Sequence, residues 1–263
     1  MPADYHTHTP LCLHATGSPV EYARAARDRG LAEIGISDHN PMPEPFDDWR
    51  MSLADFPRYL DLVAEARSDV APYPVRLGLE IDYLEGGEPW IERLAGMADW
   101  DYLIGAVHYI APGWDVDNPK HLSRFAERPV EEIWDLYWKA YTRCGASGLF
   151  DLLAHPDLVK KFGHRPSGDL RRWYDPALEA IAASGAAIEL STAGLRKPVG
   201  EMYPAPEFLR LARDAGIPIV LSSDAHSPNE VGLDFDRAAA LARSCGFAET
   251  VRFAGRRRTT EPL

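Results

Sequence analysis

Seven short apolar runs alternate with longer amphipathic stretches along this chain of 263 residues. Such alternation is typical of βα units, in which a buried parallel strand is followed by a helix, and it argues against a β-sandwich. The strands are predicted to centre on residues 5–6, 34–36, 77–80, 102–104, 149–154, 187–190 and 218–221. The sequence therefore predicts an α/β fold built on parallel strands.

The stretches between these runs carry helix signals, and the first is the clearest. Ser18 is a suitable N-cap, Pro19 takes the first helical position, Glu21 completes a capping box and Gly30 provides a stop. Residues 40–48 and 111–129 are too polar and too rich in Pro and Gly for regular elements, so we expect loops over a site there. Residues 250–262 can add a short strand, and further helices are predicted over residues 54–67, 130–143, 176–183, 206–215 and 235–245.

Composition restricts the class of protein. With 46% hydrophobic residues and no linker-like segment, we expect a single domain over residues 1–263. Lys plus Arg number 28 against 40 Asp plus Glu, and the formal net charge of -12 disfavours a nucleic-acid or anionic-membrane partner. Three cysteines without CxxC spacing, and no signal-like or membrane-spanning apolar segment, favour a cytoplasmic protein with free thiols. The composition makes no prediction of oligomeric state.

Seven of the nine histidines lie in short motifs that close the predicted strands. In a barrel of parallel strands, residues just past each strand end converge on one face, so motifs far apart in the sequence become neighbours. An unpaired buried polar group costs roughly 1 to 3 kcal/mol, so a cluster of imidazoles and carboxylates requires cations. The sequence therefore predicts a metal cluster held by His6, His8, His14, His39, Glu80, His108, His155, Asp224 and His226.

Glu80 is the candidate bridge between two ions, because it ends an apolar run where an ionised carboxylate needs a partner. A salt bridge to a Lys or Arg of the barrel is the alternative. Asp38 better fits a cap or an acceptor that orients His39, and His121 better fits a solvated side chain. Imidazole and carboxylate ligands without thiolate suit zinc, iron or manganese, and nine ligands suffice for three ions.

The chain carries no GxSxG elbow, P-loop or GxGxxG motif, so covalent hydrolase and nucleotide-cofactor functions have no support. Neighbouring cations that activate water and clamp phosphoryl oxygens are suited to phosphoester hydrolysis. A small phosphomonoester substrate also needs cationic donors outside the metal shell. The candidates for substrate binding are Arg196, Lys160, Lys161 and His164.

The strand-end motifs resemble those of the PHP (polymerase and histidinol phosphatase) superfamily along the whole chain. They are His6-Thr7-His8, Ser37-Asp38-His39, Gly78-Leu79-Glu80, Gly105-Ala106-Val107-His108, Ala154-His155 and Ser223-Asp224-Ala225-His226. Residues 8–12, 157–165 and 192–204 look like the monofunctional histidinol-phosphate phosphatases of that superfamily. The resemblance implies a distorted (β/α)7 TIM-like barrel with a trinuclear site at the C-terminal ends of its strands, which hydrolyses L-histidinol phosphate in histidine biosynthesis.

The resemblance also implies how the ligands divide. One ion would take His6, His8, Glu80 and Asp224; a second Glu80, His108 and His155; a third His14, His39 and His226. A hydroxide that bridges the first two ions would attack phosphorus, with Arg196 and one of the two lysines on the phosphate. Glu80, Asp224 and His226 are thus the expected catalytic residues, and the proton donor to the leaving group is left open between Asp38, His164 and water.

Three alternatives compete with this interpretation. Another phosphoesterase of the same superfamily, acting on nucleoside phosphates or nucleic acid, is the runner-up, and the net charge counts against long nucleic acid substrates. An amidohydrolase-like barrel also opens with HxH and cleaves C–N bonds, but no lysine ends a predicted strand here. A barrel that only stores metal would give no turnover with any phosphomonoester.

Overall fold

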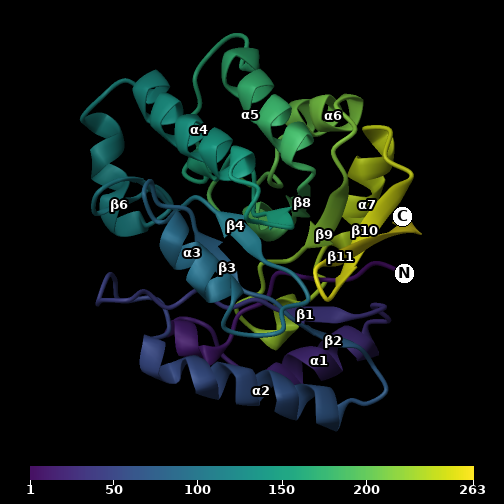
Figure 1. Ribbon diagram of the computed structural model, residues 1–263. Coiled ribbons are helices and arrows are strands. Elements are labelled where there is room, and N and C mark those ends of the chain that lie inside the picture. The colour runs from purple at the N-terminus through teal and green to yellow at the C-terminus, as the bar shows by residue number, and fades with distance from the viewer.

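A computed structural model describes all residues 1–263, and parallel strands form its centre (Figure 1). Five strands pair in the order β3–β4–β7–β8–β9, all parallel. A separate parallel pair is formed by β1 and β2. The strands are short, with bounds β1 Ile34–Ile36, β2 Val75–Leu77, β3 Glu80–Asp82, β4 Ile104–Ala106, β7 Leu152–Leu153, β8 Ala187–Ser191 and β9 Ile219–Ser222.

The N-terminal segment of residues 4–7 closes these sheets into a ring. It pairs with β1 through Asp4 and Ile34, and with the residues after β9 through Thr7 and Ala225. An isolated bridge between His39, which follows β1, and Glu80, at the start of β3, joins the two sheets on the other side. Seven parallel positions result: residues 4–7, β1, β2 with β3, β4, β7, β8 and β9. The predicted distorted (β/α)7 barrel is confirmed.

Helices cover the outside of the ring, with α1 and α2 on one side and α4 and α5 packed together on the other (Figure 1). The predicted N-terminus of α1 is confirmed, because Ser18 Oγ accepts from the Glu21 amide while the Glu21 carboxylate accepts from the Ser18 amide. No helix combines the length and apolar character needed to cross a bilayer. The bounds are α1 Pro19–Asp28, α2 Phe56–Asp69, α3 Glu88–Ala95, α4 Val130–Ala146, α5 Arg171–Ser184, α6 Pro206–Asp214 and α7 Phe235–Ser244.

Tyr102 fills the barrel interior below the site. Its hydroxyl donates to the carbonyl of Tyr5 at 2.6 Å, and a Cβ on Gly35 or Gly78 would lie only 2.0 or 2.3 Å from the Tyr102 ring system. Phe253 packs edge-on against Tyr5 from below. Glycine in β1 and between β2 and β3 therefore makes room for the tyrosine that closes the floor of the barrel.

The C-terminal segment forms an antiparallel hairpin of β10 (Glu249–Ala254) and β11 (Arg257–Pro262), where the sequence suggested one short strand. The expectation of an irregular loop over residues 111–129 is wrong. Strand β6 (Trp114–Asp115) pairs with β5 (Tyr109–Ala111), and a 3-10 helix covers Pro119–Ala126 behind an Asn118 cap. Residues 40–48 hold no helix or strand, as predicted.

Two helices differ from the sequence prediction. Helix α3 was not predicted, because it spans only 8 residues and follows two glycines. Helix α5 begins at Arg171, five residues before the predicted start, and contains Pro176 in its interior. Pro176 lies within the second turn, where the missing amide removes one hydrogen bond that the packing of α5 on α4 offsets.

Candidate metal centre

The carboxylate of Glu80 lies at the centre of the cluster, with its two oxygens facing different histidines. Oε2 lies 2.8 Å from Nδ1 of His39 and 3.2 Å from Nε2 of His6. Oε1 lies 3.1 Å from Nε2 of His155 and 3.6 Å from Nε2 of His108. Glu80 is 1% exposed and starts β3, so the strand itself directs the carboxylate into the ring of strand ends. The alternative of a salt bridge to a basic residue of the barrel is not observed.

The first group of ligand atoms comes from His6, His8 and Glu80, which all lie within 4.8 Å of one another. Asp224 joins it from the strand end after β9, with Oδ1 3.1 Å from Nε2 of His8 and 3.7 Å from Nε2 of His6. The two histidines face the same side because they are two residues apart in extended chain. The structure therefore brings together the four residues expected at one ion.

The second group consists of Glu80, His108 and His155, again with ligand atoms within 4.8 Å of one another. The histidines follow β4 and β7, which are neighbours in the sheet. These are the three residues expected at the second ion.

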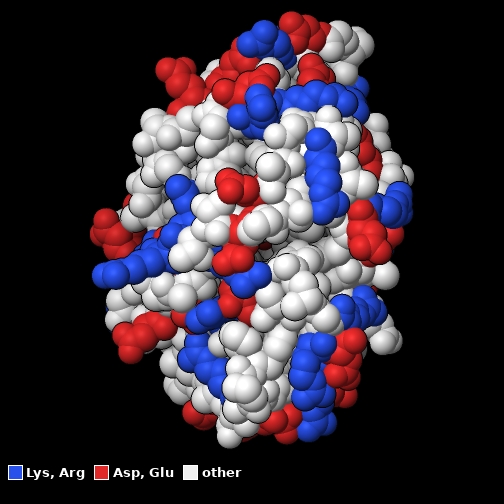
Figure 2. All heavy atoms as spheres, turned by 90° about the vertical axis from the view of Figure 1, so that its right-hand side faces the viewer, with Lys and Arg blue, Asp and Glu red and all other residues white.

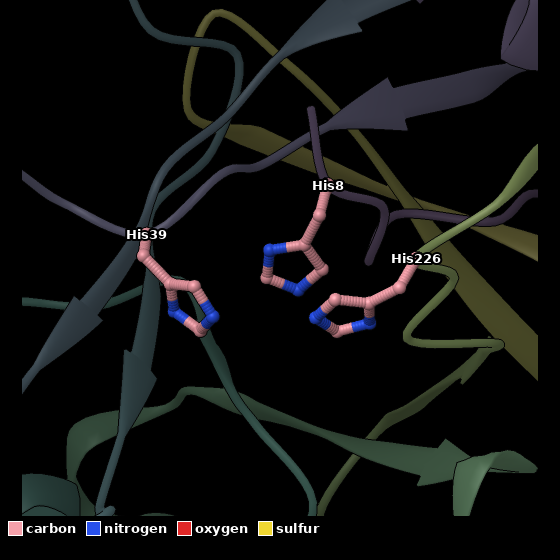
Figure 3. A group of neighbouring side chains, drawn as sticks. All are labelled: His8, His39 and His226. Atoms are coloured by element: carbon pink, nitrogen blue, oxygen red, sulfur yellow. The ribbon is translucent and has the colours of Figure 1, made fainter. Parts of the chain in front are cut away.

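The third group differs in part from the expectation of His14, His39 and His226. His8, rather than His14, completes a set with His39 and His226, and Figure 3 shows the three imidazoles directed toward a common space. The His8 ring lies 4.4 Å from that of His39 and 4.1 Å from that of His226, centroid to centroid. His14 is 4.6 Å from His226 and 5.5 Å from His39 by the same measure, so it lies at the edge of this set.

Two buried carboxylates that the sequence analysis missed hold the histidines in place. Glu189 Oε1 lies 2.8 Å from Nδ1 of His6, and its Oε2 accepts from the amide of His155 at 3.0 Å. Asp82 Oδ1 lies 2.8 Å from Nδ1 of His108. Such partners fix the tautomer and leave the opposite nitrogen free to bind a metal. Glu189 could have been recognised from the sequence, because it is a charged residue inside a predicted buried strand.

Asp38 orients a different histidine from the one expected. Its Oδ1 lies 3.4 Å from Nδ1 of His8, and it meets His39 only through that residue's amide at 2.8 Å. His121, expected to be solvated, instead pairs with the buried Asp115. The expectation that the Asp38 side chain orients His39 is corrected, because its partner His8 is remote in the sequence. The expectation for His121 is corrected because its pairing with Asp115 depends on the local fold of residues 114–126, which was predicted to be irregular.

Arg50 ties the residues 40–50 loop to the metal ligands. Its side chain is 4% exposed, and the guanidinium contacts Asp82 at 2.8 Å, Asp47 at 2.7 Å and the carbonyl of Asn40 at 3.1 Å. It also lies 4.4 Å from the Trp49 ring centroid. Because Asp82 contacts His108 with its other oxygen, the loop and the second group share one hydrogen-bonded network.

The donor set fits metal ions. His6 Nε2, His155 Nδ1 and Glu80 Oε2 are buried and lack a hydrogen-bond partner of suitable geometry. Burial raises the pKa of the Glu80 carboxyl, but the positive charge of His6, His39 and His108 outweighs burial and lowers the pKa well below its usual range. Ionised carboxylates among buried imidazoles are the ligands that zinc, iron and manganese bind.

The cluster forms the floor of a cavity of about 520 Å³. The residues 40–50 loop supplies Asp48 and Trp49 to its wall, and the segment after β6 supplies Asp117. Lys161 and Lys197 add positive charge. The cavity therefore combines a metal-binding floor, an aromatic wall and both signs of charge, which suits a small polar ligand.

Comparison with known proteins identifies the family. Residues 4–193 match the PHP domain. The chain is 44% identical to the probable histidinol-phosphatase of Deinococcus radiodurans over 97% of each chain, and 28% identical to the histidinol-phosphatase of Bacillus subtilis over 89% of this chain and 96% of that protein. This chain belongs to the PHP domain family. The crystal structure of a Lactococcus lactis histidinol phosphate phosphatase, complexed with zinc, L-histidinol and phosphate, shares the fold with a TM-score of 0.78 at 22% identity, over 98% of both chains.

Of the residues expected on the substrate of this PHP protein, Lys161 lines the cavity and Lys160 does not. Lys160 is 0% exposed, and its ammonium contacts Asp157 at 3.0 Å and Glu201 at 3.3 Å. The Lys161 ammonium lies at the cavity wall, 2.9 Å from Asp117. The expectation for Lys160 is therefore corrected, because its charge is neutralised inside the protein.

Arg196 and His164 also lie outside the cavity lining. Arg196 Nη2 donates to the carbonyl of Ser223 at 2.7 Å and Nε pairs with Glu230 at 3.2 Å, so it supports the strand end that carries Asp224. The His164 ring stacks on Phe125 at 4.5 Å. Both side chains contact protein partners and neither lines the cavity, so a contact of either with substrate stays a prediction.

Proposed function

We propose that this PHP-family protein is a metal-dependent histidinol phosphatase that hydrolyses L-histidinol phosphate to L-histidinol and phosphate. The observation that carries the proposal is the position of Glu80 between two histidine groups, since a carboxylate shared by two ions is the arrangement used for phosphoester hydrolysis. The relative from Deinococcus radiodurans, a probable histidinol-phosphatase that matches 97% of the chain, supports the choice of substrate.

The proposed ligand sets follow the groups of neighbouring side chains. His6, His8, Glu80 and Asp224 hold one ion, and Glu80, His108 and His155 a second. A third ion, of zinc, iron or manganese like the others, lies near His14, His39 and His226. When bound, the ions supply a nucleophile derived from water and stabilise negative charge on the phosphoryl oxygens. Glu80, Asp224 and His226 are then essential to catalysis because they hold these ions.

The protein itself binds and orients the substrate. Lys161 places a positive charge at the cavity wall, where it attracts the phosphate, and Asp117 at 2.9 Å fixes its ammonium. Trp49 lies edge-on to His39, with ring centroids 4.6 Å apart, and offers an aromatic wall to the imidazole of the substrate. The carboxylates of Asp48 and Asp115 also line the cavity and offer negative charge to the ammonium group of the substrate.

We also propose that residues 1–263 form a single domain, since the ring closes between the N-terminal segment and the residues after β9. The three cysteines are unpaired and buried, which supports a reducing, cytoplasmic compartment. A nucleic-acid substrate is less suited to this protein. Figure 2 shows acidic and basic side chains interspersed over the face that carries both termini, and the net charge is -12.

The test compares substrates on protein reloaded with zinc or manganese. We expect kcat/KM for L-histidinol phosphate to exceed that for p-nitrophenyl phosphate and for a nucleoside monophosphate by about 100-fold or more, since buried polar groups reject analogues that leave them unpaired. Similar values for all three would overturn the assigned substrate. A higher value for the nucleoside monophosphate would favour a different phosphoesterase of the family, and deamination of an adenosine monophosphate substrate without phosphate release would favour an amidohydrolase-like enzyme.

A further inference from the structure

Cys12 lies among the metal-binding side chains, although the metal-binding pattern of the sequence contains no thiolate. Cys12 is 0% exposed, and its sulfur belongs to two sets of potential ligand atoms. Within each set, all atoms lie within 4.8 Å of one another. One set is Cys12, His14 and His226, and the other is Cys12, His8 and Asp38. The thiol is therefore surrounded by imidazoles and a carboxylate, which is an unusual place for a cysteine that only packs as a small apolar residue.

The local backbone holds Cys12 in this position. A 3-10 turn covers Pro10–Cys12, capped by the Thr9 hydroxyl, which accepts from the Leu11 amide at 3.1 Å. The Thr9 hydroxyl also donates to Asp38, so the turn is fixed to the loop after β1. Leu13 then adopts a left-handed conformation with φ 67°, which reverses the chain and returns His14 beside Cys12. Both side chains are thereby directed at His226.

The other two cysteines have no such surroundings. Cys144 packs against Phe150 in the core near Gly105. Cys245 ends α7, and its sulfur lies 3.8 Å from the carbonyl of Pro206. Neither belongs to a group of potential metal ligands, so each is a matched control for the loss of a buried thiol.

We propose that the sulfur of Cys12 is a further ligand of the third metal ion, beside His14 and His226 of the His14, His39 and His226 set proposed for it, and that it gives this position a preference for zinc over manganese. The inference rests on the proposed metal-dependent function. On binding, the thiol loses its proton to solvent and the resulting thiolate donates an electron pair to the ion. Thiolate ligands favour zinc, whereas manganese favours oxygen donors, so a Cys-His-His set selects between the two metals.

Cobalt(II) substitution of the complete chain tests the proposal, because a cobalt–thiolate bond produces a near-ultraviolet charge-transfer band that imidazole and carboxylate ligands do not. We expect the band in the wild-type protein and in Cys245→Ser, and its loss in Cys12→Ser at full cobalt occupancy. Zinc affinity at the weakest position should fall by about 10- to 100-fold or more in Cys12→Ser, while manganese affinity changes less. Circular dichroism of each variant checks that it is folded.

A wild-type protein with three bound cobalt ions and no such band would overturn the proposal, as would a band that persists in Cys12→Ser. If Cys12→Ser does not fold, the band in the wild-type protein and its retention in both Cys144→Ser and Cys245→Ser still assign it to Cys12. Phosphate release from L-histidinol phosphate is measured on the same samples. Turnover without the band rejects the thiolate ligand alone, whereas the band without turnover rejects the proposed phosphatase function alone.

Discussion

The Glu189 carboxylate lies 2.8 Å from Nδ1 of His6, and both side chains are 0% exposed. This contact directs Nε2 of the same imidazole toward Glu80, 3.2 Å away. A single strand, β8, therefore orients a ligand that comes from the N-terminal segment. Because Glu189 also accepts from the His155 amide, it couples two of the three metal groups.

Replacing Glu189 by Gln should weaken metal binding without unfolding the protein. The amide keeps the volume but loses the charge, and its NH2 group cannot accept from the His155 amide. We expect metal affinity to fall by about 10- to 100-fold, measured by competition with a chelator. Glu33→Gln is the matched control, because Glu33 is also buried but pairs with Arg76 away from the cluster. Equal losses in both variants would show that Glu189 has no specific role.

Arg50→Ala should destabilise the protein strongly. It removes the guanidinium that is paired with the buried Asp82 carboxylate and leaves the metal ligand His108 as its remaining charged partner. Breaking such a buried pair costs about 3–5 kcal/mol in the free energy of unfolding, measured by urea denaturation. Arg58→Ala, on the exposed face of α2, should change it by no more than about 1 kcal/mol. A similar, small change in both variants would contradict the role given to the network.

Metal binding should release protons. Burial lowers the pKa of the His108 imidazole, but Asp82 and Glu80 outweigh burial and raise it to about 10, so the metal-free protein holds this proton at neutral pH. The charged ring stabilises the metal-free fold fully at a pH below the pKa that histidine has in the unfolded chain. This stabilisation is lost as the pH rises through about 10. A metal ion requires the neutral ring, so the apparent zinc affinity should rise with pH.

Calorimetry of zinc binding in buffers of different ionisation enthalpy measures these protons. We expect a clear dependence on the buffer at neutral pH, and fewer released protons in Asp82→Asn, where the largest charge that raises the His108 pKa is removed. A binding enthalpy that is the same in every buffer would contradict the protonated state of the metal-free site.

Lys161→Ala should raise KM for the phosphomonoester while the metal content stays unchanged. The ammonium lies at the cavity wall and contacts no metal-binding residue, so its loss removes only an attraction for phosphate. We expect kcat/KM to fall by about 10- to 100-fold, which corresponds to one charge-assisted hydrogen bond. Lys139→Ala, on the exposed side of α4, is the control. An unchanged KM in Lys161→Ala would remove this lysine from the substrate site.

Gly78→Ala should destabilise the fold, because the new Cβ would lie 2.3 Å from the Tyr102 ring in the barrel floor. Overpacking of this kind costs about 1–3 kcal/mol, which thermal unfolding can measure. At Gly96, which ends α3 with a φ of -90°, an added Cβ meets only ordinary contacts at 3.6 Å, so Gly96→Ala should be nearly neutral. Equal stability of the two variants would contradict the packing described for Tyr102.

The sequence predicted the ring of strands and the side chains at its centre. Short apolar runs mark strands wherever both faces are buried, and side chains that follow parallel strands must converge, so the histidines could be placed together from the strand pattern. Glu80 was expected at the end of a strand and instead starts β3, although it does join the histidines. Glu189 and Asp82 were missed, because their partners His6 and His108 become neighbours only through the order of the strands.

The cationic residues show the limit of this approach most clearly. Lys160 and Lys161 are adjacent in the sequence, yet the 3-10 turn at Leu158–Lys160 sends one ammonium into the protein and the other to the cavity. Sequence spacing cannot distinguish two such directions, because they depend on the local backbone. Arg196 was likewise expected on phosphate. The sequence did not reveal that the Ser223 carbonyl and Glu230 are its partners in the protein.

The most direct test of the account is a titration of zinc into metal-free protein while phosphate release from L-histidinol phosphate is followed in the same sample. We predict no turnover without metal, an increase that follows metal occupancy, and no recovery at equal zinc in Glu80→Gln, because Glu80 is assigned to two ions. Turnover by the metal-free protein, or full turnover by Glu80→Gln, would contradict the account.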